Sequence, residues 1–250
     1  MTGIIVVAGN PAWEESLSLP EGFALKHYPD TSRYVYRLTD DRAAMVLVDG
    51  ERDDWQFWTA TPKSSAATRR IPVVIVTADA AVQSAALASG ADIALAPDHL
   101  ADHLSAIIRE RARVPDPERE EQLDCECARS LPPLAVQGVE KFNNREFYPQ
   151  HDLFEEQWVN TDGPVRDLYR AVLQVGVAYY QIERGNHRGA LKMLLRAVQW
   201  LEALPDVCQT INVAQLKADA YAVRAELERM NPDDIAQFDM TLLKPVLLTG

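Results

Sequence analysis

The sequence predicts two domains of different fold class, an α/β domain followed by an all-helical domain. Two observations lead to this prediction. Over residues 1–113, short continuous apolar runs alternate with helix-like stretches, and after residue 113 the strand signal disappears. The length agrees, since 250 residues make one large domain or two small ones.

Four apolar runs and one partly apolar segment mark the predicted strands of the first domain. A continuous run without alternation is typical of a strand buried on both faces of a parallel sheet. These runs cover residues 3–8, 44–49, 72–77 and 93–95, and a further strand is expected over 23–27, which is apolar only from Phe23 to Leu25. Helical periodicity follows over 79–89 and 98–113. Residues 1–113 are therefore expected to form a doubly wound, five-stranded parallel sheet.

The second domain is expected over residues 125–250. Residues 114–124 are rich in proline and charge, which indicates a linker, or a linker running into a helix with an acidic first turn. The predicted helices span about 118–130, 134–145, 147–160, 164–184, 187–203 and 212–230. Short connections between them favour an antiparallel bundle, with the apolar tail 238–248 packed across it.

Charge and cysteine content bear on which partners the protein can bind and in which compartment it is expected. The formal net charge is −12, and residues 1–113 carry 11 basic against 15 acidic side chains, which argues against nucleic-acid binding. The three cysteines, an odd and low number, predict free thiols in a reducing compartment. Neither a spanning apolar run nor a signal peptide is evident in the sequence. We therefore expect a soluble cytoplasmic protein that binds neither membrane nor nucleic acid.

Three segments in the first domain carry a family resemblance. They are Leu47-Val48-Asp49, the run Ile71–Ala78, and Ser89-Gly90-Ala91-Asp92-Ile93 followed by Ala96-Pro97. In this order they resemble the receiver domain of bacterial response regulators over about residues 3–113. The resemblance implies a phospho-acceptor at Asp49 and a phosphoryl-contacting hydroxyl at Thr77.

The resemblance also implies parts that this sequence lacks. Receiver chemistry needs an acidic pair after the first strand to hold magnesium, and a lysine at the end of the fifth, because both neutralise phosphoryl charge. Here Ala8-Gly9-Asn10 occupies the first position and Ala96 the second. We therefore predict no cofactor, magnesium included, and no metal site. Asp49 and Thr77 are expected to hydrogen-bond neighbouring loop backbone. In the alternative, Asn10 and Glu51 supply atypical metal ligands.

The helical domain resembles a second family, catalogued as domain of unknown function 309, over about residues 138–204. The resemblance rests on three segments, Gly138–Trp158, Arg170–Gln174 and Arg184–Leu191. Within the first, His151, Glu155 and Trp158 share one helix face, and Gln174 on the next helix is expected to face them. These four residues are either a metal or acid–base site, or a buried polar cluster in which His151 pairs with Glu155.

The sequence thus favours a non-catalytic signalling adaptor over an enzyme. Its pseudo-receiver domain would bind a protein partner or a second copy through residues 79–113, the usual docking face of the family. Two alternatives stay open. One is a phospho-acceptor response regulator that uses Asp49 with atypical metal ligands. The other is a ligand- or metal-binding helical module centred on His151 and Glu155.

Overall fold

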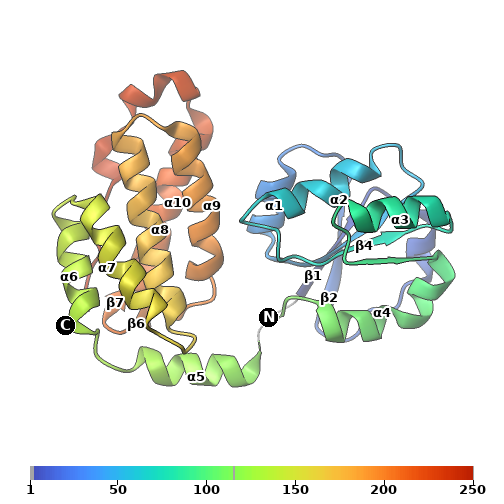
Figure 1. Ribbon diagram of the computed structural model, residues 1–250, viewed down its shortest axis with the longest axis horizontal. Helices are drawn as coiled ribbons and strands as arrows, with labels where there is room; N and C mark the ends of the chain where they lie inside the picture. The colour runs from blue at the N-terminus through green and yellow to red at the C-terminus, as the bar shows by residue number, and fades with distance from the viewer. Residues whose placement is uncertain (1–2, 115, 250) are drawn as a thin grey trace. The chain divides into compact units, whose positions relative to one another are not determined.

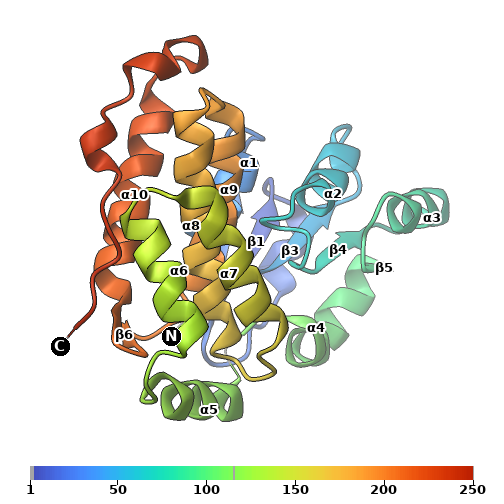
Figure 2. The ribbon, with the colours of Figure 1, turned by 60° about the vertical axis from the view of Figure 1, so that its left-hand side comes forward.

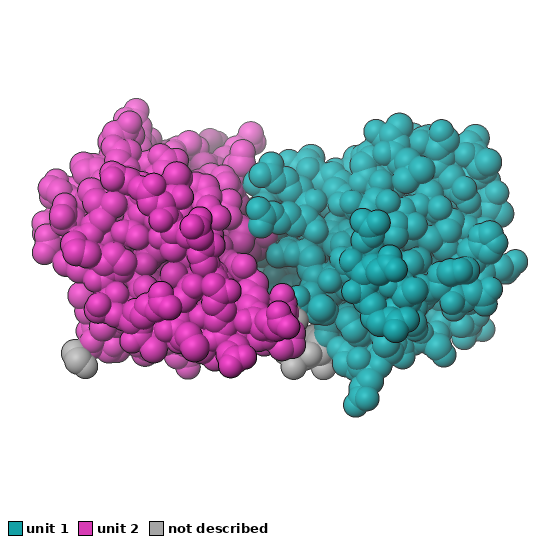
Figure 3. All heavy atoms as spheres, turned by 60° about the horizontal axis from the view of Figure 1, so that its bottom comes forward, with its two compact units in different colours: residues 1–114 teal, residues 115–250 magenta. Residues whose placement is uncertain are grey.

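The computed structural model describes residues 3–114 and 116–249. The chain divides into two compact units, unit 1 over Met1–Val114 and unit 2 over Pro115–Gly250 (Figure 3). Of the two alternatives for residues 114–124, the structure shows the helix with an acidic first turn, because most of the segment belongs to α5 (Pro117–Cys127) of unit 2. Each unit has its own hydrophobic core.

Unit 1 is built on a five-stranded sheet in the order β2-β1-β3-β4-β5. All four neighbouring pairs are parallel, and β1, β3, β4 and β5 can be followed side by side in Figure 2. The strands are β1 (Gly3–Ala8), β2 (Phe23–Tyr28), β3 (Ala43–Asp49), β4 (Val73–Val76) and β5 (Ile93–Leu95). This order reverses direction between β1 and β3, as in doubly wound sheets. The prediction of a five-stranded parallel sheet is confirmed.

Helices cover both faces of this sheet because alternate residues of each buried strand point to opposite sides. One face packs against α1 (Tyr34–Asp40), α2 (Trp55–Ser64) and α3 (Ala80–Ala88). The other packs against α4 (Pro97–Arg111) through Leu100, Leu104 and Ile108, and against the segment around the short 3-10 turn Ala12–Ser16. Each fully buried aliphatic side chain contributes about 1.5–3 kcal/mol.

Unit 2 is helical, as the sequence predicts (Figure 1). After α5 come α6 (Pro133–Asn143), α7 (Phe147–Val159), α8 (Arg166–Glu183), α9 (His187–Leu201) and α10 (Val213–Arg229). Polar side chains cap the N-termini of some of these helices. The side chains of Asn186 and Asn212 accept backbone N–H hydrogen bonds at the starts of α9 and α10. The central element is α8, which packs against both α7 and α9 and is buried along most of its length.

A small hairpin that the sequence does not reveal joins α9 to α10. Its strands are β6 (Val207–Cys208) and β7 (Ile211–Asn212). The two turn residues, Gln209 and Thr210, have φ of 47° and 66°, as a type I′ turn requires. The tail extends the hairpin, because Ile211 bridges Leu248 and Thr249 donates its backbone N–H to the Thr210 carbonyl. The tail follows two short 3-10 turns, Pro232–Gln237 and Met240–Leu242. Its Val246 is buried, which agrees with the predicted packing.

The hairpin also corrects the prediction for the cysteines. Cys127, at the end of α5, forms a disulfide with Cys208 in β6, and Cys125 is free and exposed. The prediction of three free thiols is therefore wrong for two of them. The pair is 81 residues apart, a distance across which spacing alone cannot indicate pairing. The cysteine count consequently no longer argues for a reducing compartment.

Candidate functional site

The residues singled out in unit 1 meet at the carboxyl edge of the sheet. Asp49 is the last residue of β3, Thr77 follows β4, and Gly9 follows β1. Because β1 and β4 both pair in parallel with β3, these three strand ends lie at one edge. This edge is where doubly wound sheets place their ligands.

The Thr77 hydroxyl both donates and accepts a hydrogen bond within the protein. Its side chain is fully buried, and Oγ1 donates to Glu51 Oε1 at 2.6 Å. The same oxygen accepts the Asp79 backbone N–H at 3.1 Å. Asp49 Oδ1 accepts the Glu51 backbone N–H at 3.1 Å, which closes a tight turn around Gly50. The Glu51 carboxylate therefore stands directly over the hydroxyl that the receiver resemblance assigns to phosphoryl contact.

An arginine that the sequence analysis did not single out completes the site. Arg52 donates from Nε and Nη2 to the two carboxylate oxygens of Asp54, at 2.8 and 3.1 Å. A Cβ atom built on Gly9 would lie 2.5 Å from Arg52 Nη1, so the guanidinium lies against the turn after β1. Trp58 holds the same carboxylate through an Nε1–H bond of 2.9 Å.

The charges of this cluster reinforce one another. The hydrogen bonds to Asp54 raise the pKa of Arg52, and the negative charge of Asp49 adds to the shift. Conversely, the hydrogen bonds from Arg52 hold the pKa of Asp54 below its ordinary value, and the Trp58 bond acts in the same direction. Arg52 therefore stays charged beside Asp49 at neutral pH.

These residues do not fit the magnesium ion that a receiver site implies. Mg²⁺ prefers about six oxygen ligands in near-octahedral geometry. Here the turn after β1 carries no carboxylate, the Glu51 carboxylate is hydrogen-bonded to Thr77, and the Arg52 cation lies against Gly9. Across 3–114 and 116–249, no cluster of three or more His, Cys, Asp or Glu side chains is arranged to hold a metal.

The four residues predicted as a site in unit 2 do not converge. His151 Nδ1 lies 3.1 Å from Asp152 Oδ1, while Glu155 is exposed, so the expected His151–Glu155 pair is wrong. Trp158 instead stacks on arginines of α8, with the Arg170 guanidinium 4.6 Å from its ring centroid. Gln174 is buried on α8. The arrangement provides neither a metal set nor an acid–base pair.

Two features of unit 2 were missed from the sequence. Gln150 is fully buried in α7 against Gly176 of α8, where it reaches the Leu173 carbonyl at 3.4 Å. Arg170 lies near two indole rings, those of Trp158 and Trp200, the latter at 4.2 Å. The only sequence signal for Gln150 is its spacing from Phe147 and Phe154, which marks the buried face of the helix.

The predicted docking face around residues 79–113 includes a helix with little cover. In α3 only Ala86 is fully buried, although the helix is composed almost entirely of alanine and other apolar residues. Leu87 is 49% exposed, and Ala81, Ala85 and Ala88 of the same helix are also exposed. A helix that leaves this much apolar surface uncovered is unusual for a solvent-facing element.

In the described ranges 3–114 and 116–249, no helix is both long and apolar enough to span a bilayer.

Comparison with known proteins supports the resemblance predicted for unit 2. Residues 135–193, within α6 to α9, match the family model described as "Domain of unknown function (DUF309)". The chain is also similar to an uncharacterized protein of Aquifex aeolicus (strain VF5), with 23% identity over 95 residues. That alignment covers 38% of this chain and 28% of the other protein. The resemblance of the helical unit to this family, predicted over 138–204, is thus confirmed for most of its length.

Proposed function

We propose that this protein is a non-catalytic signalling adaptor, in which unit 1 is a receiver-like domain that no longer takes a phosphoryl group. The observation that carries the proposal is that the protein's own side chains contact the places where a receiver site would hold magnesium and the phosphoryl group. Arg52 lies against Gly9 in the turn after β1, where the family carries its acidic pair, and the Glu51 carboxylate accepts the hydrogen bond of the Thr77 hydroxyl. Unit 1 would therefore hold one conformation without phosphorylation.

Electrostatics at the site opposes phosphorylation of Asp49. A phosphoryl group on this carboxylate would bring close to two negative charges toward Glu51, whose carboxylate is 2.6 Å from Thr77 Oγ1. Arg52 supplies one positive charge, but Asp54 already holds it by two hydrogen bonds. The lysine that would supply a second charge is replaced by Ala96. Asp49 would consequently remain a structural residue of the turn.

The first test titrates magnesium and beryllofluoride, a phosphoryl mimic, against the full-length protein and Asp49→Ala. For each protein, we expect the additions to leave its amide NMR spectrum and its Tm unchanged. A change in amide shifts that appears in the wild type and is lost in Asp49→Ala would contradict the proposal. It would instead support a phospho-acceptor with atypical ligands.

The proposed output is a protein–protein contact through α3. We also propose that unit 2 is an antiparallel bundle and that the protein is cytoplasmic. The net charge of −12 argues for a protein rather than a nucleic acid as partner. Besides Leu87, the exposed side chains of α3 are small, alanines and Ser84, which suits close approach of another helix or of a second copy.

Leu87→Glu is expected to weaken self-association or partner capture at least ten-fold, since an interfacial charge without a partner costs more than about 1.4 kcal/mol. Sedimentation equilibrium measures the self-association, and cross-linking in cells measures the partner. Gln56→Glu on α2 is the matched control, because it adds the same charge at an exposed helical position. Equal association by the two variants would exclude α3 as the contact surface.

A further inference from the structure

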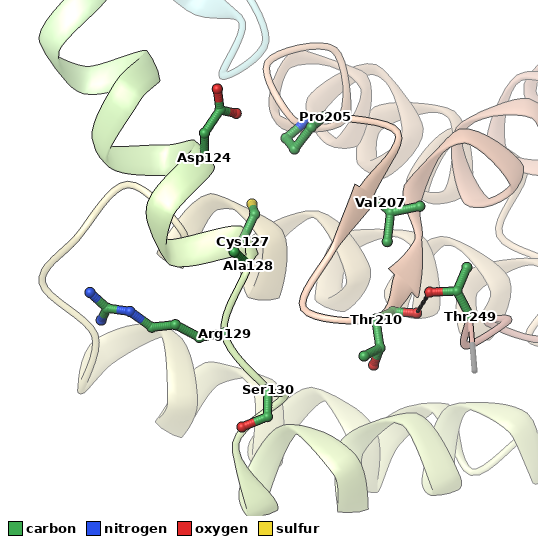
Figure 4. A pocket seen from close by; sticks show the side chains of 9 residues that line it. All are labelled: Asp124, Cys127, Ala128, Arg129, Ser130, Pro205, Val207, Thr210 and Thr249. Carbon is green, nitrogen blue, oxygen red and sulfur yellow. Dashed lines mark hydrogen bonds between the residues drawn. The ribbon is translucent and has the colours of Figure 1, made fainter.

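The disulfide of unit 2 borders an open pocket of about 610 Å³. Figure 4 shows the Cys127 side chain among the residues around this pocket. They come from the end of α5, the β6–β7 hairpin and the tail, and are Asp124, Cys127, Ala128, Arg129, Ser130, Pro205, Val207, Thr210 and Thr249. The two half-cystines differ in exposure, since Cys127 is 8% exposed and Cys208 is fully buried. Cys127 lines the pocket and Cys208 is not among its lining residues, so a thiol that enters the pocket reaches Cys127 first.

We propose that Cys127 Sγ is a reduction site, at which a dithiol reductant of the cell opens the Cys127–Cys208 disulfide from this pocket. A thiolate of the reductant attacks Cys127 Sγ, the S–S bond breaks, and Cys208 leaves as a thiolate that takes up a proton. The second thiolate of the reductant then attacks its own sulfur in the mixed disulfide and releases Cys127. Two electrons pass to the protein, and the dithiol becomes a disulfide.

Cys125 does not take part in this exchange. It precedes Cys127 by two positions in α5, and two residues of an α-helix are rotated by roughly 200° about the axis. Its side chain accordingly points away from the disulfide and is exposed. An intact α5 thus prevents internal attack, and reduction depends on an external thiol. Cys125 serves as a reference thiol that reacts in either redox state.

Reduction would loosen α5, the first helix of unit 2. Within unit 2, α5 is held by the disulfide, by the Gln209 N–H donated to the Cys127 carbonyl at 2.7 Å, and by Glu126, which accepts the Val165 N–H at 2.9 Å. A helix of 11 residues is marginal on its own. Without the covalent link, α5 would open locally and add its residues to the segment between the units.

The proposal is tested by counting thiols in the native full-length protein. Before reduction, alkylation of the oxidised protein should modify Cys125 alone. After incubation with a dithiol in native buffer, it should modify all three cysteines, and hydrogen exchange in α5 should rise on the order of ten-fold. If only Cys125 reacts until denaturant is added, the disulfide is purely structural and the proposal fails.

Two further measurements locate the attack. With glutathione and the Cys125→Ser variant, mass spectrometry should find the mixed disulfide on Cys127, and finding it on Cys208 would overturn the assignment. Ser130→Trp places a large ring in the pocket and should slow native reduction several-fold. Glu121→Trp adds the same ring at an exposed α5 position that does not line the pocket, and should leave the rate unchanged. Equal rates for the two variants would exclude entry through the pocket.

Discussion

Replacing Cys127 and Cys208 together by alanine is expected to lower the free energy of unfolding of unit 2 by about 4 kcal/mol, because the cross-link closes a long loop. The two residues are 81 positions apart, so the bond removes many conformations from the unfolded chain. Alanine keeps the two positions apolar, as the burial of Cys208 requires. Urea denaturation of both proteins, followed by circular dichroism, measures the difference.

The control for this prediction is Cys125→Ser, which alters an exposed thiol outside the disulfide and should change stability by less than about 0.5 kcal/mol. Denaturation of the wild type in excess reductant should reproduce the loss seen in the double variant. A double variant as stable as the wild type, with equal m-values, would show that the two cysteines are not joined in solution.

The strands of unit 1 were predictable because of how a parallel sheet is buried. Helices cover both faces, so nearly every residue of β1, β3, β4 and β5 is apolar, and these runs stand out without reference to the rest of the chain. The edge strand β2 is the exception, because Lys26 and His27 in it are exposed. The helices α1 and α2 gave weaker signals. The first has only seven residues and follows Arg33 in a left-handed conformation, and the second contains Pro62. The β6–β7 hairpin has two residues per strand, too few to show alternation.

The site was predictable only where neighbours in sequence are neighbours in space. The absence of the acidic pair and the lysine can be read directly, since their positions follow strands. The approach of Arg52 to Gly9 cannot, because it depends on how two loops fold over the sheet edge. In α7 the spacing rule identified a helix face, but residue 150 rather than 151 lies on the buried side. A shift of one residue rotates a helix by about 100° and exchanges core for surface.

That difference of one residue can be measured. Gln150→Ala is expected to cost about 2–3 kcal/mol, because it leaves a cavity at the α7–α8 contact. His151→Ala should cost less than about 0.5 kcal/mol, because its imidazole is partly exposed and its partner Asp152 lies on the surface. Urea denaturation of the two variants decides between the faces. A larger loss for His151→Ala would restore the polar cluster predicted from the sequence.

A double-mutant cycle with Gly176 separates packing from the loss of a polar group. In the wild type, Gly176→Ala should destabilise, because the new methyl group would lie 2.3 Å from Gln150 Nε2 and that side chain is enclosed on all sides. In the Gln150→Ala background the same substitution should stabilise, because the methyl group enters the vacated space and alanine favours a helix interior by about 1 kcal/mol over glycine. The coupling energy should therefore reach about 2 kcal/mol, whereas additive effects would show that the two residues do not touch.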